Sequence, residues 1–120
     1  YDVLAVSPAS LAANRDEWKK VIKVWYEAVD FLNDPKAHEE AVSIMAARVG
    51  LSAEEYKGFI KGTKILTLEE ALPFMKKGAG FDSIYGSTEI ADQFNVDNQV
   101  YADKQPVADY IDPSLMESLK

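Results

Sequence analysis

The sequence predicts a mainly helical fold with one or two short β-strands. Apolar residues recur at helical spacing along most of the chain, and several of these stretches open with a helix-capping signature. The run from Val3 to Val6 is instead apolar without a break, which is typical of a strand buried on both faces. The chain has 120 residues, of which 48% are hydrophobic. This length and composition are usual for one packed domain, so we expect residues 1–120 to form a single unit.

Residues 1–7 are predicted to form a buried strand. Such a strand needs neighbours that satisfy its backbone N–H and C=O groups. The chain offers few of them, namely residues 63–67 and, less clearly, residues 99–101. We therefore expect the chain to be a piece of a longer protein. The alternative is a complete small domain with a two-stranded edge.

The helices follow from caps and apolar spacing, taken in chain order. Ser7 and Pro8 predict a short helix through Ala13. Asn14, with Glu17 three residues later, predicts the start of the longest helix. The apolar stripe of this long helix is expected to face the interior, and it consists of Trp18, Ile22, Trp25, Val29 and Leu32.

Five more helices are predicted after Asn33. Ser52 with Glu55 forms a capping box, and Thr67 with Glu70 repeats it after a short strand over residues 64–66. Pro73 is expected to kink or shorten the helix that Thr67 opens. The predicted starts and ends are residues 35–49, 52–62, from 67 onward, 83–94 and 113–119, with Gly50 as a left-handed cap of the first.

Charge and residue types exclude several classes of function. The 13 Lys and Arg residues against 20 Asp and Glu give a net charge of −7, so nucleic acid is not an expected partner. The absence of cysteine excludes thiol nucleophiles and cysteine-ligated metals. No run approaches the roughly 18 apolar residues of a membrane-spanning helix.

No residue pattern indicates catalysis or a metal site. His38 follows Asp30 and Asp34 at spacings of four, but Pro35 interrupts the helix between them, so a surface histidine is the better interpretation. The paired glutamates each lie in a first helical turn, where the helix dipole favours them over an acid–base role; they are Glu39-Glu40, Glu54-Glu55 and Glu69-Glu70. We expect no enzyme, no cofactor and no metal.

Five segments carry a resemblance to a known family. They are residues 1–7 (YDVLAVS), 25–31 (WYEAVDF), 45–52 (MAARVGLS), 62–70 (GTKILTLEE) and 83–87 (SIYGS). Each segment alone is ordinary helix-packing and capping sequence and is not specific to one family. Their order and spacing together closely resemble the C-terminal part of ABC-transporter solute-binding proteins of the nitrate, sulfonate, taurine and thiamine-precursor group. The resemblance covers nearly the whole chain, although a full member is more than twice as long.

The resemblance implies a fold and a function. The fold would be the C-terminal segment of a two-lobed α/β periplasmic-binding-protein-like structure of type II, with residues 1–7 as the strand returning between the lobes. Residues 8–120 would be the helical part that completes one lobe. The function would be that of the extracytoplasmic solute-binding component of an ABC importer, which captures a small anionic, nitrate-, sulfonate- or taurine-like ligand between its lobes.

The same resemblance implies partners, a location and a site. The partners would be the solute, the membrane permease and the remaining lobes of the full-length chain, and the location periplasmic or extracellular and membrane-anchored. Because the return strand would run antiparallel to its neighbours, its beginning would lie at the cleft, which makes Tyr1 and Asp2 the expected ligand-binding residues. The alternative function is a self-contained helical protein-interaction domain without small-molecule activity.

Overall fold

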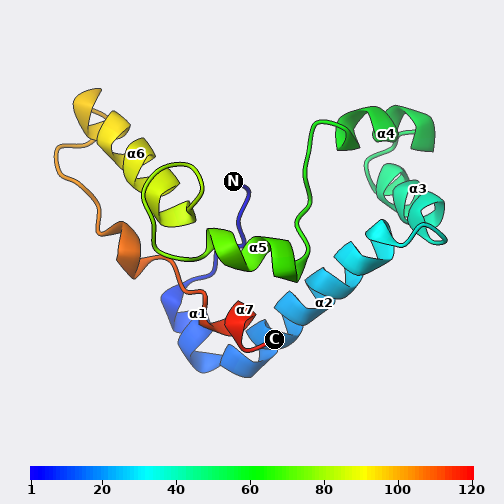
Figure 1. Cartoon of the computed structure of the whole chain (residues 1–120), viewed down its shortest axis with the longest axis horizontal. Coiled ribbons are helices and arrows are strands. Elements are labelled where there is room, and N and C mark those ends of the chain that lie inside the picture. The colour runs from blue at the N-terminus through cyan, green and yellow to red at the C-terminus, as the bar shows by residue number, and fades with distance from the viewer. The chain divides into compact units, whose positions relative to one another are not determined.

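The computed structural model describes residues 1–120, and every regular element in it is a helix (Figure 1). The chain divides into two compact units, of which unit 1 comprises residues 1–19 and 68–120 and unit 2 comprises residues 20–67. The elements are α1 (Pro8–Ala13), α2 (Arg15–Asn33), α3 (His38–Arg48), α4 (Ala53–Ile60), α5 (Leu68–Phe74), α6 (Ile84–Asp97), the 3₁₀-helix η1 (Val107–Asp109) and α7 (Ser114–Glu117).

The predicted α/β fold is wrong, because neither expected strand forms and no sheet exists. Residues 1–7 and 64–66 have no regular structure, so the chain does not have the architecture of a type II binding-protein segment. Val3 and Leu4 are 63% and 61% exposed, and the backbone of residues 2–6 makes no hydrogen bond. An apolar run becomes a strand only beside a second strand, and the chain supplies none. The side chain of Ile65 packs against helices instead.

Unit 2 is built on one small apolar cluster. Leu32 near the end of α2 packs with Ala41 and Val42 of α3, and all three are less than a tenth exposed. Partly buried side chains close the cluster from α3, α4 and the segment that follows; they are Met45, Ala53, Tyr56, Ile60 and Ile65. Helices α3 and α4 therefore lie against each other, as Figure 1 shows.

The junction between α3 and α4 confirms the local sequence signals. Gly50 has a φ of +73°, the left-handed conformation that glycine adopts without steric cost. The Ser52 hydroxyl accepts from the backbone N–H of Glu55, and the Glu55 carboxylate accepts from the backbone N–H of Ser52 at 3.0 Å. This reciprocal pair is the predicted capping box, and it satisfies N–H groups that the helix itself leaves unpaired.

The long helix forms as expected, but its interior face is narrower than predicted. Val29 and Leu32 are buried, whereas Trp25 is 57% exposed, so the expectation for Trp25 is wrong. Leu32 reaches the α3 cluster from the last turn of α2, and Trp25 lies about two turns earlier, beyond the reach of that cluster. The apolar stripe of α2 therefore continues past the part of the helix that packs.

In unit 1, short helices pack at close range. α5 lies against α7, and α6 lies against η1. Pro73 stands in the last turn of α5, which ends one residue later and so confirms the predicted shortening. Gly86 of α6 is buried, and a Cβ atom there would lie 2.5 Å from the backbone nitrogen and oxygen of Gly80. A hydrogen atom at position 86 is what lets residues 79 and 80 pass directly over this helix.

Arg15 fastens the start of α2 to the C-terminal part of unit 1. Its guanidinium nitrogens lie 3.3 Å from the Asp112 carboxylate, and one of them also donates to the Ser114 hydroxyl. Hydrogen bonds from Ser114, and then the nearby Arg15 charge, lower the pKa of Asp112. The ion pair is partly exposed, so we regard it as an orienting contact more than a source of stability.

The capping box predicts a pH-dependent mutational effect. Ser52→Ala should lower the free energy of unfolding by about 1 kcal/mol at neutral pH. The Ser52 hydrogen bonds hold the pKa of Glu55 below its ordinary value, so their contribution is present above that ordinary value. It is lost as the pH falls through the lowered pKa. Urea unfolding at a series of pH values checks this, and a gap between wild type and Ser52→Ala that widens in acid would contradict it.

Candidate functional site

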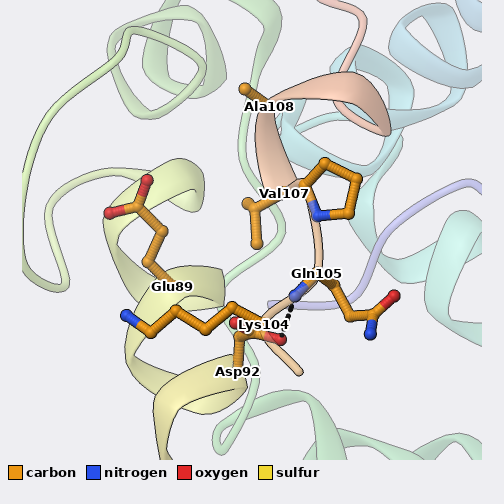
Figure 2. A pocket seen from close by; sticks show the side chains of 7 residues that line it. Glu89, Asp92, Lys104, Gln105, Val107 and Ala108 are labelled. Atoms are coloured by element: carbon orange, nitrogen blue, oxygen red, sulfur yellow. Dashed lines mark hydrogen bonds between the residues drawn. The ribbon is translucent and has the colours of Figure 1, made fainter. Parts of the chain in front are cut away.

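A hollow in unit 1 lies between α6 and the segment that leads into η1. Its volume is about 430 Å³ and it opens broadly to solvent. Glu89 and Asp92 come from α6, one turn apart, and the other wall follows the loop after that helix (Figure 2). The residues of that wall are Lys104, Gln105, Pro106, Val107 and Ala108.

Asp92 is the buried polar centre of this hollow. It is 5% exposed, and its Oδ1 atom accepts from the Tyr101 hydroxyl at 2.8 Å and from the backbone N–H of Gln105 at 3.1 Å. Figure 2 shows the second of these bonds, which joins α6 to the chain entering η1. Asn95, one turn further along α6, donates to the Tyr101 oxygen at 3.2 Å. A single carboxylate therefore holds the loop from 98 to 106 onto its own helix.

The environment of Asp92 changes the acidity of Tyr101. The Asn95 hydrogen bond lowers the pKa of Tyr101, but the hydrogen bond to Asp92, burial and the negative charge of Asp92 together outweigh it. The pKa of Tyr101 is consequently raised above its ordinary value, and the phenol stays protonated as the donor to Asp92.

The residues of the hollow hold a loop in place and do not form a group arranged for catalysis. Asp92 already accepts two internal hydrogen bonds, and no histidine, serine or threonine lines the walls beside it. Glu89 and Lys104 supply one charge of each sign at the rim. A general acid–base pair or an activated nucleophile needs groups within hydrogen-bond reach of one another and of a substrate. The hydrogen bonds of Asp92 hold the loop after α6 against that helix.

The structure places the two expected ligand-binding residues apart from this hollow. The Tyr1 hydroxyl donates to the carbonyl oxygen of Phe81, and the Tyr1 ring meets the Phe74 ring edge-on with 5.8 Å between centroids. Asp2 is exposed, and no side chain of opposite charge lies beside it. Ligand binding at Tyr1 and Asp2 stays a prediction, and the contacts of Tyr1 are those of an anchor for the first residues.

The remaining polar candidates are used within the fold. His38 Nδ1 lies 2.8 Å from the carbonyl oxygen of Leu32, where it ties the start of α3 to the end of α2. Glu39 accepts from the Lys57 ammonium at 2.9 Å, and this contact lowers the pKa of Glu39. No group of three or more histidine and carboxylate side chains is arranged to hold a metal ion. None of the helices has the length and apolar character needed to cross a bilayer.

In comparisons with known proteins, no family model, no curated protein and no solved structure matches the chain. The resemblance to ABC solute-binding proteins therefore rests on the ordered sequence segments alone.

Asp92 and Tyr101 provide a direct test of this attachment of the loop. Asp92→Asn should lower the pKa of Tyr101, because it removes the negative charge that opposes formation of the phenolate. The change also weakens the attachment of the loop and should lower the free energy of unfolding by about 1–3 kcal/mol. An NMR titration of ring-labelled Tyr101 and urea unfolding measure the two effects. Glu89→Gln, which alters the same hollow without touching Tyr101, is the matched control and should leave that pKa in place.

Proposed function

We propose that this chain is a helical protein-interaction module whose apolar surface binds another polypeptide. The observation that carries this proposal is the amount of apolar side chain left in water. Fifteen large apolar or aromatic residues are between 41% and 70% exposed, whereas nine hydrophobic residues are buried and only Val42 is completely enclosed among the large side chains. Scattered exposed apolar residues are normal, but contiguous ones mark interaction sites.

The exposed area supports the same proposal. The whole chain exposes 8718 Å². Two compact proteins of the sizes of the two units would together expose about 7,700 Å² by the usual scaling of area with mass. The excess indicates surface that internal packing leaves uncovered, and a bound partner would cover it.

Two stretches of the chain, one in each unit, carry part of this exposed apolar surface. In unit 1, Val3 and Leu4 stand exposed on a segment whose backbone groups lack hydrogen-bonding partners from residue 2 to residue 6. A segment of this kind can add as a strand to the open edge of a partner's sheet, where main-chain hydrogen bonds supply affinity. In unit 2, exposed apolar residues line one side of α2.

Photo-crosslinking tests the interaction function at both stretches. A photoreactive phenylalanine analogue is placed at Leu4 or Val24, and at Lys36 or Lys76 as exposed controls in unit 2 and unit 1. Irradiation in a lysate of the source cells should yield a discrete adduct, identified by mass spectrometry, from position 4 or 24 and not from the control in the same unit. Adducts no different from those of the controls at both positions would overturn the proposal.

A second candidate function is the one that the sequence resemblance implies: part of the solute-binding component of an ABC importer, acting with a membrane permease and with further parts of a longer chain. The order of the five segments between residues 1 and 87 is the specific observation that favours it. In this candidate the apolar surface contacts the rest of that longer chain, and a small anion binds near Tyr1 and Asp2.

Calorimetric titration with nitrate, taurine and an alkanesulfonate separates the two candidates. Under the second candidate, residues 1–120 alone should bind none of these anions with useful affinity, because such ligands are enclosed between two walls. A longer chain that contains these residues should bind one of them, and Tyr1→Ala should weaken that binding. Absence of binding by the longer chain, or binding that Tyr1→Ala leaves unchanged, would speak against the solute-binding function or its site.

A further inference from the structure

Residues 2–6 of unit 1 expose two kinds of group at once. Their backbone N–H and C=O groups make no hydrogen bond with the rest of the chain. Val3 and Leu4 are 63% and 61% exposed, and Ala5 is exposed as well. A partner that covers these side chains also removes the backbone groups from water, and buried backbone groups need hydrogen-bonding partners of their own.

Both ends of this segment are attached to unit 1. The Tyr1 hydroxyl donates to the carbonyl oxygen of Phe81, and the Tyr1 ring contacts the Phe74 ring edge-on. At the other end Ser7 caps α1, because its hydroxyl accepts from the backbone N–H of Ser10 at 3.2 Å. A segment held at both ends loses less conformational freedom on binding than a free one does. The attachments therefore favour binding through the residues between them.

The unpaired backbone groups select the kind of partner. A helix or an apolar groove could cover the side chains of Val3 and Leu4, but it would leave the N–H and C=O groups of residues 2–6 buried without partners, which costs free energy. The open edge of a β-sheet instead offers a row of unpaired N–H and C=O groups with the spacing of an extended chain. Of these partners, the sheet edge alone satisfies the backbone and covers the side chains.

The order of the side chains describes that sheet. In a strand, Val3 and Ala5 would point to one face and Leu4 and Val6 to the other. Apolar residues on both sides are typical of a strand in a sheet that is covered on both faces. A second copy of this chain offers only another single segment, and a pair of strands alone would leave these apolar faces in water. The side chains therefore fit a formed sheet in a different protein.

We infer that residues 2–6 bind by strand addition to the open edge of a β-sheet in another protein, a sheet that is covered on both faces. The inference rests on the proposed interaction function and names the chemistry of the partner for unit 1. Along an edge strand, the hydrogen-bonding groups of alternate residues point toward the sheet and those of the others point away. The N–H groups of Val3 and Ala5 would therefore lie on one edge, and those of Leu4 and Val6 on the other.

Methylation of single backbone nitrogens tests this alternation, because it removes one N–H donor and adds a methyl group on that edge of the backbone only. The protein that crosslinks to position 4 is purified, and its Kd is measured for chains N-methylated at Val3, Leu4, Ala5 or Val6. Methylation at one alternate pair, either 3 and 5 or 4 and 6, should raise the Kd about tenfold at each position. Methylation at the other pair should leave the Kd unchanged, so each pair is the matched control for the other.

The absence of cysteine makes these chains accessible. Synthetic residues 1–12 are joined to residues 13–120 through a temporary cysteine at position 13, which is then desulfurised to the native Ala13. Because the chain has no cysteine of its own, no other residue is altered.

The outcomes separate strand addition from the broader interaction function. Far-UV circular dichroism verifies that each methylated chain keeps its helix content, as expected for changes that precede α1. A Kd that responds equally at all four positions, or at none of them, would overturn the inference. So would the absence of an adduct from position 4, or an adduct with a second copy alone. If position 24 still crosslinks to a protein in any of these cases, the interaction function stands and only strand addition is excluded.

Discussion

Backbone hydrogen bonding in this protein is entirely local, and that constraint governs the rest of the structure. Every regular element is a helix, and the backbone bonds outside helices join residues no more than five positions apart. Contacts between residues far apart in the sequence must therefore come from side chains. Among the large side chains, only Val42 is fully enclosed. Unit 2 depends on Leu32, Ala41 and Val42. In unit 1 the buried hydrophobic residues are Leu72, Tyr85, Val107 and Leu115. The Asp92 hydrogen bonds attach the loop after α6 to that helix, and the Arg15 ion pair orients the start of α2.

Local signals made the helices predictable. Ser7, Ser52 and Gly50 act through atoms only a few residues away, so their effect can be read without knowledge of the fold. Asn14 shows the limit of this reading, because it ends α1, and its side chain bonds back to the Ser10 carbonyl. The expected strand over residues 1–7 failed for the opposite reason: a strand is defined by a neighbour elsewhere in the chain, and its own composition cannot supply one.

The sequence could not predict the role of Asp92, because that role also depends on residues elsewhere in the chain. Asp92 stands in a helix among other polar residues, and nothing in its spacing separates a buried acceptor from a solvated one. Its partners Tyr101 and Gln105 reach it only after the chain reverses beyond α6. Likewise, the five apolar residues predicted to line α2 have the correct helical period. Which of them are covered depends on where α3 meets the helix, and Trp25 lies outside that contact.

Two glycines lie inside helices, Gly58 in α4 and Gly86 in α6, and they differ in whether a larger residue can replace them. Around Gly58 a Cβ atom would meet nothing within 4 Å, and alanine is the better helix former by about 1 kcal/mol, so this position is open to stabilising change. At Gly86 the same methyl group would collide with the backbone of residues 79 and 80, which cannot rotate away as a side chain could. Helix α6 and the loop before it are consequently one unit of sequence design. Any residue other than glycine at position 86 would require the loop before α6 to follow a different path. A redesigned loop that still crosses α6 at this point must keep Gly86.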